Sequence, residues 1–425
     1  MSDLNLRAPI WHPFTQHGLN VAPVAVARAE GAYLYAQDGR VIIDAISSWW
    51  VNLHGHGHPR IADAIAAQAG KLEQVIFAGF THEPAETLAR KLLELAPPGL
   101  SYAFFSDSGS TSVEVAIKMA VGCWHNRKRP RHKIIALEHA YHGDMFGAMS
   151  VGQRGLFNAA YETMLFEVAY LPFPERGREQ RTVDALKTLL ANEPDAFAAL
   201  IIEPLVLGAG GMRMYSAEVL AEIASLCQRH DVFFIADEVM TGFGRTGTMF
   251  ACEQARVTPD LMCLSKGLTG GFLPMGATLA STEIYDAFYS QDRAKTFFHS
   301  SSYTGNAIAC AAAVANLEIF EMEPVAARIA TLGERQVQHL AKFQDRPEIA
   351  EIRQTGTIAA LELKASDAGY FAALGPKLNR FYLEKSVLLR PLGNVVYVLP
   401  PYCIAADALK QVYEAIDESL GLIGG

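Results

Sequence analysis

Between residues 47 and 321, short apolar runs alternate with helical stretches, and this alternation constrains the fold more than any other feature. Most runs are apolar throughout, as parallel strands are when helices cover both faces of a sheet. We therefore predict an α/β fold whose large domain, 47–321, carries a mostly parallel seven-stranded sheet. The mixed helix and strand pattern elsewhere predicts a smaller α+β domain from both termini, 1–46 and 322–425, with a hairpin at Gln37–Arg40. The predicted sheet strands are 102–106, 133–137, 166–171, 199–203, 232–236, 261–265 and 276–281.

Two of the predicted strands end on charged side chains. Residues 261–265 lead into Lys266, and residues 232–236 lead into Asp237. A lysine in a partly desolvated place has a lowered pKa, and its neutral amine attacks carbonyl groups. A lysine and a carboxylate are also the two protein groups that pyridoxal phosphate chemistry requires, the first for a Schiff base and the second for the pyridine nitrogen. Each of them alone fits a solvated strand end equally well.

A third strand end carries a small, hydroxyl-rich turn. Strand 102–106 is followed by Asp107-Ser108-Gly109-Ser110 and then by a helix with one apolar face. Helix N-termini with free amides bind phosphate, so this turn is a candidate phosphate site, with Ser110 or a neighbour as N-cap. The turn lacks the Gly-Lys-Ser/Thr of a P-loop, and alone it also fits an ordinary capped helix. Because ligands bind at the carboxyl ends of strands in open α/β sheets, the three strand ends can form one site.

Charge and composition argue against several classes of protein. The formal net charge is −9, and the one basic cluster, 127–131, is predicted to be a solvated helix end, so nucleic-acid binding is disfavoured. No apolar stretch reaches the roughly eighteen residues of a membrane span, and the N-terminus lacks the features of a signal peptide. The six scattered cysteines include no Cys-x-x-Cys pair, which indicates reduced core residues of a cytoplasmic protein and no metal site.

Motifs along nearly the whole chain are similar to those of the class III, ornithine-type aminotransferases, which share fold type I of pyridoxal-phosphate-dependent transferases. The phosphate turn, the aromatic residue, the aspartate and the lysine follow one another in the family's order. The resemblance implies a pyridoxal 5′-phosphate cofactor and a homodimer with shared active sites. The motifs are 107–110, 139–143, 202–204, 237–239, 242–247, 265–267 and 303–306.

Four further segments resemble the branch of this family that aminates 8-amino-7-oxononanoate in biotin synthesis. They are 11–16, 47–50, 210–215, and 389–393 together with 397–401. The resemblance implies 8-amino-7-oxononanoate as amino acceptor, S-adenosylmethionine as donor and ping-pong transamination. Some relatives use lysine as donor, and an ω-amine or acetylornithine-type aminotransferase is the alternative enzyme. A non-catalytic binding protein that kept the fold is the alternative from another class.

The resemblance also assigns the residues around the cofactor ring. Lys266 would form the Schiff base and carry the proton between substrate and cofactor, and Asp237 would pair with the pyridinium. Tyr141 and Val239 would pack against opposite faces of the ring.

A second group of residues is assigned to the cofactor phosphate. Gly109 and Ser110 would bind it through backbone and hydroxyl donors. Ser301 and Ser302 match the segment that reaches across the dimer interface to the phosphate of the neighbouring subunit.

The remaining assignments concern the substrates. Trp49 and Trp50 would line the channel, and the Arg390 guanidinium would hold the oxononanoate carboxylate. Phe14 replaces a tyrosine of some relatives and so loses a hydrogen bond, and Asp144 fits either a substrate cation or a turn cap. The predicted substrate-binding residues are Phe14, Trp49, Trp50, Tyr141, Asp144, Lys266, Ser300 and Arg390.

Overall fold

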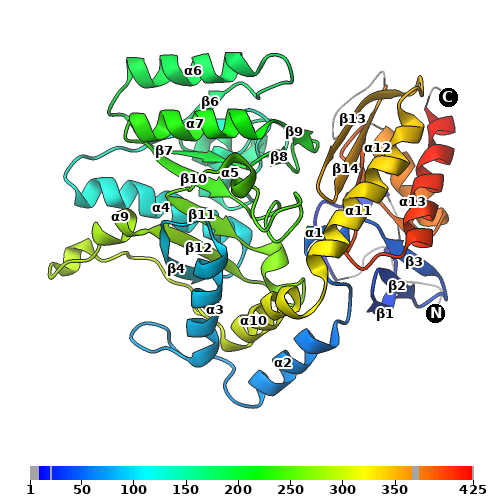
Figure 1. Ribbon diagram of the computed structural model, residues 1–425, viewed down its shortest axis with the longest axis horizontal. Helices are drawn as coiled ribbons and strands as arrows, with labels where there is room; N and C mark the ends of the chain where they lie inside the picture. The colour runs from blue at the N-terminus through cyan, green and yellow to red at the C-terminus, as the bar shows by residue number, and fades with distance from the viewer. Residues whose placement is uncertain (1–8, 20–21, 366–372, 424–425) are drawn as a thin grey trace.

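The computed structural model describes residues 9–19, 22–365 and 373–423 and shows a larger α/β part beside a smaller part that contains both ends (Figure 1). The larger part is built on a seven-stranded sheet of order β4-β12-β11-β10-β7-β5-β6. Strands β6, β5, β7, β10 and β11 are parallel, whereas β12 is antiparallel to both β11 and β4. The predicted mostly parallel sheet is confirmed. Its strands are β4 (Leu100–Ser106), β5 (Lys133–Leu137), β6 (Val168–Leu171), β7 (Phe197–Ile202), β10 (Phe233–Asp237), β11 (Leu261–Leu264) and β12 (Gly276–Ser281).

Helices cover both faces of this sheet, which explains why its strands are apolar throughout. In β5, Ile135 and Leu137 belong to one hydrophobic cluster, whereas Ile134 and Ala136 belong to another on the opposite face. The helices of this part are α2 (Pro59–Ala69), α3 (Glu83–Leu95), α4 (Gly109–Asn126), α5 (Phe146–Val151), α6 (Glu179–Asn192), α7 (Ala217–Arg229), α8 (Cys252–Ala255), α9 (Thr282–Asp286) and α10 (Ala307–Met322).

Both ends of the chain contribute to the smaller part. The predicted hairpin is present, with Tyr33 opposite Ile43, and β15 (Val387–Leu388) extends its sheet by pairing parallel with β3. A second, three-stranded sheet has the order β13-β14-β16. The other elements here are β1 (Val26–Glu30), β2 (Tyr33–Ala36), β3 (Val41–Asp44), α1 (Ser47–Trp50), α11 (Val325–Leu340), β13 (Ile349–Thr355), β14 (Ile358–Leu363), α12 (Leu374–Glu384), β16 (Val395–Val398) and α13 (Ala406–Ser419).

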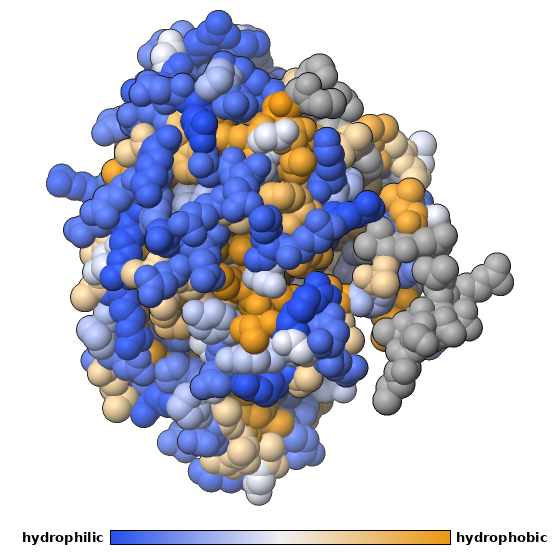
Figure 2. All heavy atoms as spheres, turned by 90° about the vertical axis from the view of Figure 1, so that its right-hand side faces the viewer, coloured by the Kyte–Doolittle hydropathy of each residue, from blue (hydrophilic) through white to orange (hydrophobic). Residues whose placement is uncertain are grey.

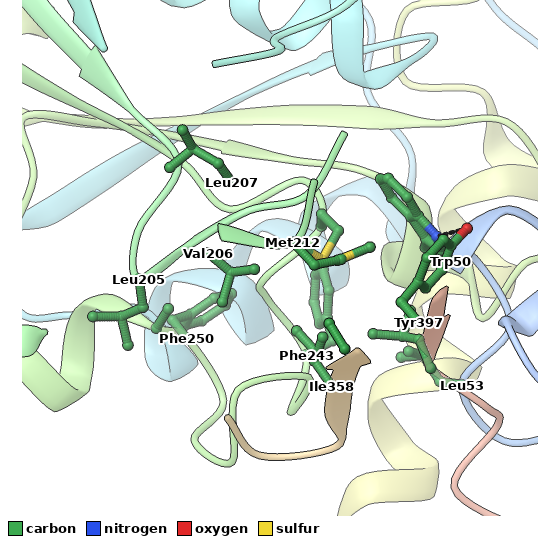
Figure 3. Close-up of a cluster of buried hydrophobic side chains, with 14 of the residues drawn as sticks. Trp50, Leu53, Leu205, Val206, Leu207, Met212, Phe243, Phe250, Ile358 and Tyr397 are labelled. Atoms are coloured by element: carbon green, nitrogen blue, oxygen red, sulfur yellow. Dashed lines mark hydrogen bonds between the residues drawn. The ribbon is translucent and has the colours of Figure 1, made fainter. Parts of the chain in front are cut away.

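A buried cluster joins the two parts (Figure 3). Trp50 donates its indole N–H to the Tyr397 hydroxyl at 3.0 Å, and Phe243 and Phe250 pack edge to face close by. The short strand β8 (Val206–Leu207) contributes both its residues to this cluster and pairs with β9 (Arg213–Met214). Short 3-10 turns complete the fold at His17–Leu19, Ala159–Met164, Lys266–Thr269, Arg293–Lys295, Ala341–Phe343 and Leu420–Leu422.

The surface carries mainly polar side chains. Figure 2 shows the face on the right of Figure 1, where hydrophobic residues gather between hydrophilic ones toward the centre. In the part of the chain that the structure describes, no helix is long and apolar enough to cross a membrane. The same residues contain no group of three His, Cys, Asp or Glu side chains that could hold a metal ion. All six cysteines are free, and only Cys403 is exposed.

The basic cluster after α4 differs from the prediction. The helix does end at Asn126, but Arg131 is only 3% exposed and is not part of a solvated helix end. Its guanidinium lies 4.0 Å from the centroid of the Trp124 ring and donates to Asp195 Oδ1 at 2.7 Å. The stacking and the ion pair explain why a charged side chain can be buried here.

Candidate functional site

The three predicted strand ends meet at one edge of the large sheet. Strands β10 and β11 pair with Asp237 opposite Cys263, so Asp237 and Lys266 leave neighbouring strands at the same edge. The first residue of α4, Gly109, packs against the same place: a Cβ added to it would lie 2.8 Å from Val239 Cγ1 and 3.5 Å from Ser265 Cβ. A side chain at position 109 would therefore push the helix N-terminus away from the two charged strand ends.

Lys266 begins a 3-10 turn directly after β11 with a positive φ of 46°, a strained conformation for a residue with a Cβ. Its Nζ lies 4.8 Å from the centroid of the Trp50 ring. Burial lowers the pKa of Lys266 from its ordinary value, although the charges of Asp237 and Glu203 act in the opposite direction. The structure therefore favours the neutral, nucleophilic amine more than water would.

Asp237 is paired with a histidine that the sequence reasoning did not single out. The Asp237 Oδ2 atom lies 2.6 Å from His142 Nδ1, and Oδ1 accepts the amide of Val239 at 3.1 Å. Burial by itself would lower the pKa of His142, but the hydrogen bond and charge of Asp237 outweigh it, so the pKa of His142 is raised. The carboxylate is thus fixed in orientation by one imidazole and one backbone amide.

Glu203 is a second buried carboxyl group at this edge, and it follows β7 directly. It accepts the amides of Tyr141 at 3.1 Å and Gly208 at 3.0 Å. Burial raises the pKa of Glu203 to about 7, with Asp237 adding to the rise and His142 opposing it. Glu203 therefore positions the backbone of Tyr141. The sequence contained a signal for Glu203, because it follows an apolar strand directly, and Asp237 and Lys266 were predicted from that same feature.

The phosphate turn forms the N-terminus of α4. The N-cap is Ser108 and not Ser110, because Ser108 and Thr111 form a reciprocal capping box. The first amides of a helix have no partner within it, so those of Gly109 and Ser110 are available to an anion. Ser110 Oγ accepts the amide of Asp144 at 3.2 Å, and a Cβ at Gly143 would lie 2.1 Å from that oxygen. Only glycine at position 143 permits this approach.

The serines of 300–302 lie on a separate segment that approaches the same turn. Ser301 Oγ donates to Asp107 of its own chain, and Ser302 offers its carbonyl to Gln74 Nε2 at 3.1 Å. The Ser300 hydroxyl donates to the carbonyl of Ser301 at 3.2 Å. Within the described residues, none of these serines hydrogen-bonds to Gly109 or Ser110.

Tyr141 keeps an exposed ring beside these groups, with 36% of its surface accessible. Partial burial raises the pKa of Tyr141, and the nearby Asp144 carboxylate adds to the rise. The phenol therefore stays protonated at neutral pH. Asp144 itself is exposed. Within the described residues, its carboxylate accepts no hydrogen bond from a backbone amide, so it does not cap a turn.

Three of the predicted substrate residues, Phe14, Trp49 and Arg390, form one cluster. The ring centroids of Phe14 and Trp49 are 5.8 Å apart, and the Arg390 guanidinium lies 5.2 Å from the centroid of the Trp49 ring. Arg390 Nη2 also donates to the Phe14 carbonyl at 3.3 Å. No described carboxylate lies within salt-bridge distance of Arg390. Trp50 points elsewhere, because it is buried between Lys266 and Tyr397.

The sequence profile of the family described as "Aminotransferase class-III" matches residues 14–420. The chain therefore belongs to the class III aminotransferases. Among its curated relatives, the adenosylmethionine-8-amino-7-oxononanoate aminotransferase of Synechococcus elongatus is 49% identical over 97% of this chain and 98% of the relative.

Solved structures agree with this family. The adenosylmethionine-8-amino-7-oxononanoate aminotransferase of Methanocaldococcus jannaschii has a TM-score of 0.93 at 35% identity and covers 98% of this chain and 97% of its own. An amine transaminase from an uncultivated Pseudomonas species, solved in a PLP-bound form, also has a TM-score of 0.93, at 30% identity over 98% and 99% of the two chains. The predicted type I fold is thereby confirmed.

Proposed function

We propose that this chain is a pyridoxal-phosphate-dependent aminotransferase that converts 8-amino-7-oxononanoate into 7,8-diaminononanoate in biotin biosynthesis. The observation that carries the proposal is the cluster of Phe14, Trp49 and Arg390, in which Trp49 is the chain neighbour of Trp50, the ring that lies against Lys266 Nζ. It places a guanidinium that has no carboxylate partner among the described residues next to two aromatic rings, which suits a substrate with an apolar chain and a terminal carboxylate. The names and full-length similarity of the relatives support the same substrate.

The residues at the strand ends fit pyridoxal 5′-phosphate. The α4 N-terminus with Gly109 and Ser110 suits the phosphate, and the buried carboxylate of Asp237 suits a protonated ring nitrogen. We assign Tyr141 and Val239 to the two faces of the cofactor ring. When bound, the cofactor supplies an aldehyde that takes up the amino group and a ring that accepts electrons.

Lys266 performs the proton transfer in this proposal. Its lowered pKa favours the neutral amine, which can take a proton from the donor carbon and return one to the acceptor carbon. The Trp50 ring 4.8 Å away excludes water from one side of Nζ and limits where the amine can move. Asp237, oriented by His142, would provide the carboxylate that pairs with a protonated ring nitrogen in both half-reactions.

Arg390 binds the acceptor carboxylate, and Trp49 and Phe14 pack along its apolar chain. We assign Asp144 and the Tyr141 hydroxyl, which interact with one another, to receive an ammonium group of either substrate. We propose S-adenosylmethionine as donor because the relatives carry it in their names. Lysine is the alternative donor, and the two are distinguished by the assay below.

We further propose a cytoplasmic homodimer with shared active sites. Several large apolar side chains around the 298–303 segment are exposed in the single chain, among them Ile76, Phe80, Phe298 and Tyr303. A second copy would cover them. Ser301 or Ser302 of the partner subunit would then add a donor to the phosphate site.

The experiment is a transamination assay on the purified, cofactor-loaded protein with 8-amino-7-oxononanoate and a panel of amino donors. Formation of 7,8-diaminononanoate from S-adenosylmethionine supports the proposal, and formation from lysine alone corrects the donor. Amine transaminases share this fold, so a simple ω-amine with pyruvate is the comparison reaction. Faster turnover of that pair than of the oxononanoate would overturn the proposed substrate.

A further inference from the structure

The segment that carries the two tryptophans has an unusual backbone. Ser47, Ser48 and Trp50 have positive φ values of 51°, 58° and 65°, and the segment of α1 is non-helical at Ser48 and Trp49. Such conformations are unfavourable for residues with a Cβ and persist only where surrounding contacts hold them. Something other than local preference therefore fixes the directions of Trp49 and Trp50.

Asp44, the last residue of β3, supplies those contacts. Its side chain is fully buried, and Oδ1 accepts the amides of Ile46 at 3.2 Å and Ser48 at 2.9 Å. Oδ2 accepts the Ser48 hydroxyl at 2.9 Å and lies 2.8 Å from His56 Nε2. Ser47 adds a bond from its hydroxyl to the Leu399 carbonyl at 2.8 Å. One carboxylate thus uses both oxygens to hold the turn before the tryptophans.

Because of this turn, the two neighbouring tryptophan rings point in different directions. Trp49 faces outward to Phe14 and Arg390, whereas Trp50 faces inward to Lys266. In a regular strand, successive side chains point to opposite faces of a sheet. Here the left-handed residues set the directions of the two rings instead, Trp49 toward Phe14 and Arg390 and Trp50 toward Lys266.

We propose that Asp44 and Ser48 are positioning residues that determine the preference of the enzyme for a long, carboxylate-terminated acceptor. They act through Trp49 and touch no substrate themselves. The proposal rests on the proposed function, because it concerns recognition of the same acceptor. The preference for this acceptor would then depend in part on the buried Asp44 carboxylate, which holds the backbone that carries Trp49.

The most informative variant is Ser48→Gly. Glycine tolerates the left-handed backbone, so the change removes the hydroxyl contact to Asp44 while relieving strain. A merely structural role predicts unchanged activity with equal or higher thermal stability. Our proposal predicts a looser Trp49 at that same stability. Asp44→Asn is the companion variant, since the amide NH2 that takes the place of Oδ2 donates and cannot accept from Ser48 or His56.

Specificity is measured as the ratio of single-turnover kcat/KM for 8-amino-7-oxononanoate to that for aminoacetone, which is an α-amino ketone without the chain or carboxylate. Ser48→Gly should lower this ratio by about threefold to tenfold, the range expected for one hydrogen bond. Asp38→Asn is the matched control, because Asp38 is an exposed carboxylate that binds Arg40 in the β2–β3 turn. It should leave the ratio unchanged.

A second readout is independent of catalysis. In a Trp11→Phe background, which removes the other exposed indole, iodide should quench tryptophan fluorescence more strongly in Ser48→Gly than in the parent. An unchanged specificity ratio together with unchanged quenching would overturn the proposal. If the parent protein fails to aminate the oxononanoate at all, the proposed function is wrong. In that case the quenching alone tests whether Ser48 positions Trp49. Unchanged quenching in Ser48→Gly would overturn that positioning role, and increased quenching would uphold it.

Discussion

Arg390 offers the sharpest test of the acceptor assignment. The perturbation is Arg390→Met, which keeps an unbranched side chain to pack on Trp49 while removing the charge and the donors. In the structure the guanidinium makes one bond to the Phe14 carbonyl at 3.3 Å and no salt bridge with a described carboxylate. Its donors are therefore free to bind a substrate carboxylate without first breaking an ion pair.

The size of the effect follows from that geometry. A hydrogen bond to a charged group contributes about 1.5–3 kcal/mol, and about 1.4 kcal/mol corresponds to a tenfold change in rate. Arg390→Met should therefore lower kcat/KM for 8-amino-7-oxononanoate by about tenfold to a hundredfold or slightly more. Arg390→Lys keeps a point charge but loses the planar fork, so its loss should be smaller.

The assay separates the two half-reactions by stopped-flow absorbance of the cofactor. Donor addition to the aldehyde form should change by less than about threefold in either variant, because the donor does not need the distal carboxylate site. Arg380→Met on the exposed face of α12 is the control and should behave as the parent. An equal loss in both half-reactions would refute the reasoning and make Arg390 a structural residue or a carboxylate site shared by both substrates.

Four further outcomes are expected. Lys266→Ala should abolish amino transfer while its melting temperature stays close to that of the parent, and turnover near the parental rate would exclude its assigned role. Asp237→Asn should still bind the cofactor but slow both half-reactions severely in single-turnover experiments; unaltered rates would contradict its charge role. Glu203 has a folded pKa of about 7 against an ordinary 4.5, so the folded chain binds more protons between these pH values and stability falls as pH rises through them. Glu203→Gln should flatten that decline in urea melts at pH 5 and pH 8, and an unchanged slope would count against it. Sedimentation of the parent should show a dimer, and Ser302→Ala should weaken cofactor binding; an active monomer would contradict the shared site.

The sequence was sufficient to predict which strand ends form the candidate site. Lys266 and Asp237 were predictable because apolar runs of parallel strands end at a common edge, and pairing in the structure confirms that edge. The turn at the start of α4 was predictable because a hydroxyl-rich segment precedes an amphipathic helix, whereas its binding of phosphate stays a prediction. The N-cap was harder to assign, since the capping box of Ser108 depends on the reciprocal bond from Thr111.

Properties that arise from tertiary contacts were not predictable from the sequence. The pKa of Glu203 depends on burial beside Asp237 and His142, which come from separate strand ends. The burial of Arg131 likewise depends on Trp124, which no local pattern links to it. Local pattern gives the place of a residue along a strand or helix, whereas its charge state depends on neighbours that the fold brings from elsewhere.

The arrangement of acids at the centre has a chemical consequence. Two buried carboxyl groups lie near one histidine, and electrostatics disfavours two unpaired negative charges in such a place. The pKa of Glu203 is raised to about 7, and backbone amides satisfy its oxygens, so it is substantially protonated near neutral pH. Asp237 is the one that receives the imidazole whose pKa is raised. The ion pair at this edge of the sheet is thereby formed by Asp237 and His142, and Glu203 can serve as a backbone anchor without competing for positive charge.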